Sequence, residues 1–483
     1  MTSEPRQVFV WVWLPGEREP VVAGRLDAVG EIVTFTYGRS YLEHEGAIPL
    51  YLPELPLRRG AIDPLVGEVA GCIADSAPDS WGRRVILDRR VDGYTLDGAL
   101  GDTTDLGLLT YLLESGSDRI GALDFQTSAS AYVPRVATGA TLAELSESAR
   151  RVEEGIPLSP ELDQALLHGS SIGGARPKAL LREGAGEGVH GGEARGDGTN
   201  SDNTDGDGTD GDGTNSDYTD GDGTDGDDTD GDDTDRDGTD GDDTDGAIAG
   251  DGAPGAIAKF SSSTDTYPVV KGEFLAMELA RRAGLDVAKV RLTRALGKDV
   301  LLIDRFDRPP DGSRRLMISA LTILGLDELG ARYASYAELA HSIRTRFTDP
   351  LFTLHELFAR ITFNILVSNN DDHARNHAAF WDGRELTLTP AYDICPQPRA
   401  GGEAAQIMAI GEDGYRMSQL AGCVARASTY MLSEAQAREI VDRQIETIET
   451  EWLGVCDLAE LTEVDRARFW RRQFLNPYAF EGY

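Results

Sequence analysis

The chain has few cysteines, a shortage of basic residues and no long apolar run. Its four cysteines, Cys72, Cys395, Cys423 and Cys456, lie far apart without a CxxC pair, which argues against a zinc ribbon or disulfide framework and fits a reducing cytosol. Lys and Arg number 46 against 83 Asp and Glu, so the net charge is −37 and direct binding to a polyanion such as DNA is disfavoured. No stretch approaches the ~18 apolar residues of a membrane helix, so we expect a cytoplasmic protein without a membrane partner.

One segment accounts for much of the negative charge. Residues 197–245 contain 21 Asp, one Arg and no Glu or Lys. Because this region has almost no apolar side chains to offset its ordering entropy, residues 184–256 are predicted to be a disordered acidic insert. Residues 233–238 fit the start of a calcium loop, but Thr244 stands where such a loop needs a bidentate Glu. A flexible acidic tether is the favoured interpretation.

The rest of the chain shows the periodicities of both strands and helices. Its 483 residues exceed the usual single-core limit of ~250–300, so at least two structural units are expected. Strands are predicted at residues 8–14, 31–37, 179–181, 257–260, 287–292 and 300–306, and helices at 273–283, 354–365 and 433–452. The two strands that flank the insert would form a β-hairpin with an expanded turn. From Met317 onward helices are expected to prevail, so the predicted fold is α+β.

The most informative stretch is Asn369–His377, directly after a predicted amphipathic helix. Asp371 and Asn376 stand five apart, which is the Asp-x-x-x-x-Asn spacing of a protein-kinase catalytic loop. That chemistry needs a carboxylate to accept the proton of a substrate hydroxyl and an amide oxygen to coordinate Mg²⁺. Asp393 would supply a further acidic metal ligand. A polar loop at a helix end, with Asn and Asp as caps, explains the stretch about equally well.

A metallohydrolase is a competing interpretation of the same stretch. His373 and His377 are four apart, and one helix face would present both to Zn²⁺, although the Glu of an HExxH site is missing. Alternatively, Asp371, Asp372 and Asp393 would hold a two-metal centre for hydrolysis. The choice depends on whether the chain also supplies ligands for nucleotide phosphates.

Such ligands are present in the sequence. Ser170–Lys178 is a small-residue loop ending in a lysine, in which Gly173 and Gly174 let backbone N–H groups approach phosphate. Lys259 interrupts an otherwise apolar strand, and Glu273 on the following helix is placed to pair with it, as in kinases. Taken singly, these features also fit a β-turn, a solvated edge lysine and a helix N-terminal charge. Their order along the chain, however, is the order of a kinase.

With these motifs in order, the chain resembles the HipA family of toxin-type serine/threonine kinases. The similar segments are Asp75–Arg83, Ser117–Leu123, Ser171–Lys178, Lys271–Glu273, Ile303–Arg308, Asn369–Asn376 and Pro390–Asp393. The resemblance implies a bilobal fold like that of phosphatidylinositol-3/4-kinases. Its expected parts are a β-rich N-terminal subdomain at residues 5–112, a nucleotide-binding N-lobe at 113–306 that carries the insert, and a helical catalytic C-lobe at 307–483.

The resemblance also implies roles for individual residues, with ATP and Mg²⁺ as cofactors. Asp371 would be the catalytic base, His373 would lie beside the transferring phosphate, and Asn376 and Asp393 would hold Mg²⁺. Glu273 would support Lys259. The residues implied for ATP are Ser171, Ile172, Gly173, Gly174, Ala175, Lys178, Lys259, Asp304 and Phe306, the last two at the lobe hinge.

Regulation and partners follow from the same resemblance. The family autophosphorylates a serine of the glycine loop, a position that Ser171 occupies, with Ser170 adjacent. Phosphate there would repel the phosphates of ATP. The family pairs with a small helix-turn-helix antitoxin, so DNA would be bound only indirectly, and its protein substrates include aminoacyl-tRNA synthetases. A catalytically silent module that binds an antitoxin–operator complex, or a metal-dependent phosphohydrolase, would be the alternatives.

Overall fold

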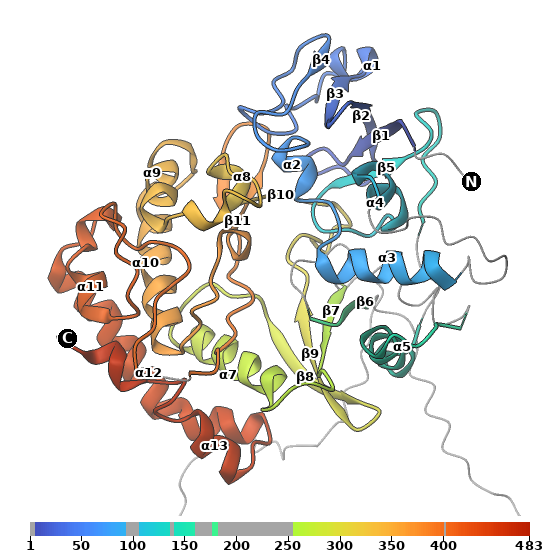
Figure 1. Ribbon diagram of the computed structural model, residues 1–483. Coiled ribbons are helices and arrows are strands. Elements are labelled where there is room, and N and C mark those ends of the chain that lie inside the picture. Colours follow the sequence, from blue (N-terminus) through green and yellow to red (C-terminus); the bar gives the residue numbers. More distant parts are fainter. Residues whose placement is uncertain (1–4, 93–105, 136–139, 160–175, 182–254, 400–401) are drawn as a thin grey trace, which may run out of the picture. The chain divides into compact units, whose positions relative to one another are not determined.

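The fold is given by a computed structural model (Figure 1), which describes residues 5–92, 106–135, 140–159, 176–181, 255–399 and 402–483. The described residues all belong to one of the two units into which the chain divides, and the other unit, residues 187–249, lies outside them. Most of the predicted acidic insert, with its candidate calcium loop, therefore also lies outside the described residues. Within them, no helix is long and apolar enough to cross a bilayer.

An antiparallel sheet of five strands opens the chain, in the order β4-β3-β2-β1-β5. Its strands are β1 Gln7–Val12, β2 Val21–Val29, β3 Ile32–Tyr37, β4 Ala61–Ile62 and β5 Leu123–Gln126. The helices that the structure describes in the N-terminal part are α1 Arg39–Leu42, α2 Gly71–Ala74, α3 Ser80–Asp92, α4 Leu108–Glu114 and α5 Leu142–Glu154, of which α3 and α5 pack against the second sheet. The strands predicted at residues 8–14 and 31–37 correspond to β1 and β3.

A second antiparallel sheet has the order β6-β7-β9-β8. Its strands are β6 Lys178–Leu181, β7 Ala256–Phe260, β8 Val290–Ala295 and β9 Lys298–Asp304, and helix α7 spans Val269–Arg282. The predicted hairpin is confirmed, because β6 pairs with β7. Since β7 begins at Ala256, the insert predicted to reach that residue ends earlier. Helix α7 begins before the predicted residue 273, and β8 lies later than the predicted 287–292.

Alternation along β6 and β7 gives the second sheet two different faces. Ala179, Ala258 and Phe260 belong to the apolar cluster that α3 and α5 complete with Trp81 and Leu145. The other face carries the cross-strand pair Lys178 and Lys259 toward α7, because residues directly opposite in an antiparallel sheet share a face. A sheet that is apolar on one face thus holds two lysines on the other.

The C-terminal part contains a third sheet, which the sequence analysis did not predict. Strands β10 Leu316–Ser319, β11 Ala378–Trp381 and β12 Leu386–Leu388 pair in that order. The expectation that helices prevail after Met317 holds, but these strands were not predicted, because they are only three or four residues long and their periodicity is hard to detect. The pairing of β10 with β11 places the segment before α8 next to the segment that follows Asn369–His377.

Helices make up most of the remainder of the C-terminal part. They are α8 Ala320–Ile323, α9 Tyr336–Arg346, α10 Pro350–Leu366, α11 Leu420–Val424, α12 Glu434–Leu458 and α13 Glu463–Phe469, with 3₁₀ turns η1 Ala331–Tyr333, η2 Ala374–Asn376, η3 Ala427–Tyr430 and η4 Pro477–Phe480. The predicted capping box is present at α12, where Ser433 caps the helix and Gln436 reciprocates. Helix α12 packs against α7 and α10 (Figure 1).

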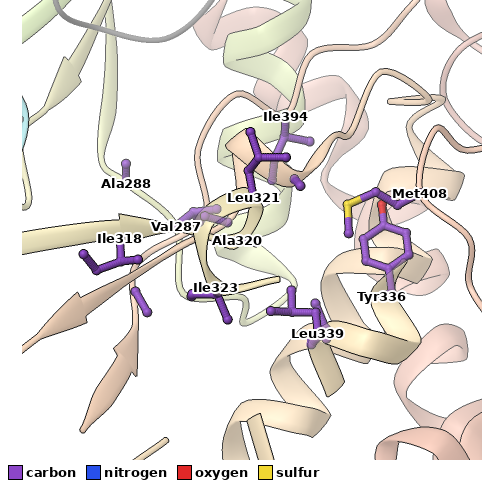
Figure 2. Packing of buried hydrophobic residues seen from close by; sticks show 14 of the residues in the cluster. Val287, Ala288, Ile318, Ala320, Leu321, Ile323, Tyr336, Leu339, Ile394 and Met408 are labelled. Atoms are coloured by element: carbon purple, nitrogen blue, oxygen red, sulfur yellow. The ribbon is translucent and has the colours of Figure 1, made fainter. Parts of the chain in front are cut away.

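A large apolar cluster joins the third sheet to the helices around it. Figure 2 shows part of this cluster, which includes Leu321 of α8, Tyr336 of α9 and Ile394 from the chain after β12. Because Ile394 directly follows Asp393, the core anchors the backbone that carries this candidate ligand. The site described next is therefore built on packed elements.

Candidate functional site

Three charged side chains meet between β7, α7 and the chain after β12. Lys259 Nζ lies 2.6 Å from Glu273 Oε1 and also contacts Asp393 Oδ1. The contact expected between Lys259 and Glu273 is therefore present. Burial favours the neutral lysine, but Asp393 and Glu273 outweigh it and raise the pKa of Lys259, while burial raises the pKa of Glu273. Lys259 is thus held as a cation between two acids.

The motif Lys271–Glu273 explains how α7 reaches this position. Lys271 Nζ donates to the backbone carbonyl of Glu460 at 3.0 Å, which ties α7 to the end of α12. A Cβ atom at Gly272 would come within 3.0 Å of the Phe469 ring, so glycine allows α13 to approach closely. Glu273 is then turned toward the sheet. The motif therefore fixes the helix that presents Glu273.

Asp393 adopts an unusual backbone conformation. Its φ is +59°, in the left-handed region that costs a non-glycine residue about 1 kcal/mol or more. Such strain persists where the surroundings over-determine it and is frequent at functional sites. Burial alone would raise the pKa of Asp393, but Lys259 and then Lys178 outweigh it and hold the pKa below its ordinary value. Asp393 is therefore held as a carboxylate beside two lysines.

Lys178 completes this group, which we call the lysine cluster (Lys178, Lys259, Glu273 and Asp393). It faces Lys259 in the strand register, and its side chain is 1% exposed. Its Nζ lies 2.7 Å from Asp79 Oδ2, and its backbone carbonyl accepts a hydrogen bond from Trp81 Nε1 at 3.1 Å. Sequence reasoning assigned no role to Asp79, although the segment Asp75–Arg83 was among those that carried the family resemblance.

The Asn369–His377 stretch lies where α10 ends. Asp371 is exposed, whereas the neighbouring Asp372 is buried and accepts hydrogen bonds from Tyr336 Oη at 2.5 Å and Asn364 Nδ2 at 2.8 Å. A third bond joins Asp372 Oδ2 to His377 Nε2 at 2.8 Å. Sequence reasoning did not identify Asp372 as this anchor, because its burial depends on the packing of Tyr336, 36 residues away in sequence. The buried carboxylate of Asp372 therefore anchors the loop, while the neighbouring Asp371 side chain is exposed to solvent.

The remaining polar residues of the loop lie in or beside η2. Asn376 is buried, and its backbone N–H donates to the carbonyl of His373 at 2.8 Å. Burial raises the pKa of Asp371; His373 opposes this, whereas Asp393 and Asp372 add to it. Asp371 and Asp393 therefore interact electrostatically.

The two residues expected at the lobe hinge, Asp304 and Phe306, lie in different environments. Asp304 ends β9, and its carboxylate pairs with Arg291 at 3.0 Å near the surface. The ring of Phe306 lies 5.8 Å from that of Tyr392 and 6.0 Å from that of Phe380. Because Tyr392 precedes Asp393, Phe306 lies close to the lysine cluster, whereas the side chain of Asp304 is engaged elsewhere.

The segments at residues 117–123 and 303–308 meet in a buried ion network. We call it the arginine network: Asp118, Arg305, Asp307 and Arg308. Arg305 lies 2.7 Å from both acids, and Arg308 lies 2.7 Å from Asp307 and 3.2 Å from Asp118. Both segments carried the family resemblance in the sequence, but the contact between them was not predicted. Their role here is to join β9 to the N-terminal part.

The glycine loop cannot be placed in this site. Its residues Ser170, Ser171, Ile172, Gly173, Gly174 and Ala175 lie outside the described residues, so their assignments stay predictions. The strand that follows them does bring Lys178 to the site. The sequence-predicted residues that the structure brings together are therefore Lys178, Lys259, Glu273 and Asp393, with Asp371 in electrostatic range.

The donor set fits Mg²⁺ and a polyphosphate. Asp393 and Asn376 offer carboxylate and amide oxygens, which Mg²⁺ prefers, and two buried lysines offer positive charge. Among the described residues, no three His, Cys, Asp or Glu side chains are grouped to hold a metal ion. The zinc alternative is also disfavoured, because it needs His373 and His377 on one helix face, whereas both have extended backbone and flank a 3₁₀ turn of three residues. The described geometry does not favour a hydrolase.

Comparisons with known proteins point to one family. The model of the HipA N-terminal domain matches residues 12–126, and that of the HipA-like C-terminal domain matches residues 170–452. The serine/threonine-protein kinase toxin HipA of Shewanella oneidensis is 24% identical over 147 residues, covering 26% of this chain and 34% of that protein. Y4mE of Sinorhizobium fredii, whose name assigns it provisionally to the kinases, is 28% identical over 149 residues, covering 29% and 33%.

A solved structure extends the likeness to the fold. A chain from the complex of HipA, HipB and operator DNA of Shewanella oneidensis MR-1 is 18% identical, with a TM-score of 0.60 over 97% of this chain and 95% of that one. The matches to the curated relatives span only about a third to a half of those proteins' lengths.

The fold is therefore of the α+β class, with the architecture of the HipA chain in that complex. Because the HipA-like C-terminal domain model covers more than half of the sequence and the N-terminal model matches ahead of it, the chain belongs to the HipA family.

Proposed function

We propose that this chain is an ATP- and Mg²⁺-dependent protein serine/threonine kinase that phosphorylates a cellular protein. The observation that carries the proposal is the contact of Lys259 with both Glu273 and Asp393. A strand lysine paired with a helix glutamate next to a metal-type carboxylate is the arrangement by which kinases hold nucleotide phosphates and metal. Family membership supports the same chemistry.

Each residue would contribute to phosphoryl transfer in a different way. Asp371 accepts the proton of the substrate hydroxyl, and His373 stands beside the transferring group. Asn376 and Asp393 would hold Mg²⁺, which neutralises charge on the phosphates when bound. Lys178 and Lys259 bind phosphate oxygens together with the loop Ser171–Ala175, and Glu273 keeps Lys259 in place. Backbone groups of Asp304–Phe306 would meet adenine.

Partners and regulation are proposed on the same basis. The solved relative is a complex with HipB and operator DNA, which supports a small antitoxin as the partner here, with DNA contacted through it. We also propose that Ser171 is autophosphorylated and that an aminoacyl-tRNA synthetase is a candidate substrate. The division at residues 5–112, 113–306 and 307–483, the likeness to phosphatidylinositol-3/4-kinases and the cytoplasmic location stay predictions.

Incubation with γ-labelled ATP, Mg²⁺ and a cell lysate tests the proposal. We expect label on at least one lysate protein and on Ser171 of the chain itself, both abolished by EDTA. Mass spectrometry of the labelled proteins identifies the phosphorylated residues and the substrate. A chain that transfers no label to any protein would be the silent binding module, and release of phosphate from phosphoesters without ATP would indicate a hydrolase.

The pH dependence of transfer should reveal the environment of Asp371. An ordinary aspartate has a pKa of ~3.9, and burial raises the pKa of Asp371 above this. A base must be deprotonated, so kcat/KM should fall as the pH drops through the raised pKa, at a higher pH than an ordinary aspartate requires. His373 opposes the rise, so His373→Asn should shift this acidic limb further upward. An unchanged limb in that variant would contradict the assignment of the base.

A further inference from the structure

Helix α3 begins beside the strand that follows the glycine loop (Figure 1). Asp79 stands directly before this helix, and its Oδ1 accepts the backbone N–H of Gly82 at 2.8 Å. Its other oxygen, Oδ2, lies 2.7 Å from Lys178 Nζ. The same turn supplies Trp81, whose Nε1 donates to the backbone carbonyl of Lys178 at 3.1 Å. Both the side chain and the backbone of Lys178 are therefore held by one turn.

The position of Lys178 makes such support necessary. Lys178 and Lys259 are directly opposite on neighbouring strands, where like charges repel. Lys259 pairs with Glu273 and Asp393, and Lys178 pairs with Asp79 at 2.7 Å, while Asp393 also acts on Lys178 electrostatically. Without the Asp79 carboxylate, the buried ammonium of Lys178 beside that of Lys259 would lose its proton or move away from the site.

A gain in folding stability does not explain why Lys178 and Asp79 form a buried ion pair. Lys178 is 1% exposed and Asp79 is 11% exposed, so both charges lose most of their hydration. Burial lowers the pKa of Lys178 and raises that of Asp79. A buried pair of this kind often contributes no more than an apolar pair of the same size. What the pair does supply is a fixed cation beside Lys259.

We propose that Asp79 is a positioning residue for phosphate binding, which holds the Lys178 ammonium next to Lys259. Asp79 lies in the part matched by the HipA N-terminal domain model, whereas Lys178 lies in the part matched by the C-terminal model. The N-terminal domain thus contributes to the nucleotide site through α3. This inference rests on the proposed function, because it assumes that Lys178 binds ATP phosphates.

Asp79→Asn tests the inference, because the amide keeps an oxygen for Gly82 and replaces the charged oxygen that faces Lys178 with an uncharged NH2 group. We expect the affinity for ATP, measured by calorimetry with Mg²⁺, to fall about 10- to 100-fold. This is the range of one lost charged hydrogen bond, here the one that Lys178 would donate to a phosphate oxygen. The affinity for adenosine, which has no phosphate, should stay unchanged. Asp88→Asn on the same helix, at a side chain 39% exposed, is the matched control and should bind both as the parent does.

A double-variant cycle separates positioning from general damage. If Asp79 acts through Lys178, adding Asp79→Asn to Lys178→Met should cause no further loss of ATP affinity. The double variant also lacks an unpaired buried ammonium, so it should fold even where Asp79→Asn alone does not. Equal losses for ATP and adenosine, or additive losses in the cycle, overturn the inference. A parental chain that binds no ATP would instead overturn the proposed function itself.

Discussion

Asp371→Asn should reduce phosphoryl transfer by about 10² to 10⁴-fold, the usual contribution of a general base. The asparagine side chain has the same shape but accepts no proton from a substrate hydroxyl. The buried contacts that hold the loop belong to Asp372 instead, so the fold should persist. ATP affinity should change little compared with the rate. Single-turnover transfer at saturating ATP measures the loss in the chemical step directly.

Asp382→Asn is the matched control for this prediction. Asp382 stands in the exposed turn between β11 and β12, where its Oδ1 accepts the backbone N–H groups of Arg384 and Glu385 at 2.8 Å. An asparagine keeps that acceptor, so both transfer and stability should match the parent. Transfer by Asp371→Asn at the parental rate would show that another group is the base.

The site residues that sequence reasoning identified share one property. Lys259, Glu273, Asp371 and Asp393 each stand out locally, as a charge in an apolar strand or at a kinase-like spacing. Such signals are visible within a few residues. Asp79 and the anchoring role of Asp372 could not be found in this way, because they depend on contacts with Lys178 and Tyr336, which lie 99 and 36 residues away in sequence. Tertiary contact, not local pattern, makes them part of the site.

The same holds for the fold: elements whose signal lies in neighbouring residues were predicted, and those that depend on residues far apart in sequence were not. The capping box at Ser433 and the long apolar periodicity of α10 are local, and both predicted helices are present. The hairpin of β6 and β7 was also predictable, because apolar runs flank the insert. The third sheet was not, since each of its strands is short and β10 finds its partner β11 far along the chain. The motif Ile303–Arg308 was recognised in the sequence, but its contact with Asp118 was not predicted.

Asp307→Asn should destabilise the fold by about 3–5 kcal/mol, the usual cost of removing one partner from a buried ion pair. Asp307 is 1% exposed, accepts the backbone N–H of Gly121 at 2.9 Å, and lies 2.7 Å from both Arg305 and Arg308. The amide removes the negative charge and leaves two buried guanidinium groups with Asp118 as their remaining acid. The midpoint of urea unfolding, followed by tryptophan fluorescence, should fall accordingly.

The pH dependence of this loss provides a second readout. Burial would raise the pKa of Asp307, but Arg305 and Arg308 outweigh it and hold the pKa below the ordinary value. The stability from this charge is therefore present above the ordinary aspartate pKa and lost as the pH falls through the depressed one. The difference between parent and Asp307→Asn should accordingly shrink in acid. Asp311→Asn, at an exposed turn where the amide oxygen still accepts from Ser313, should leave the midpoint almost unchanged. If Asp307→Asn unfolds at the parental urea concentration, the arginine network does not hold β9 to the N-terminal part.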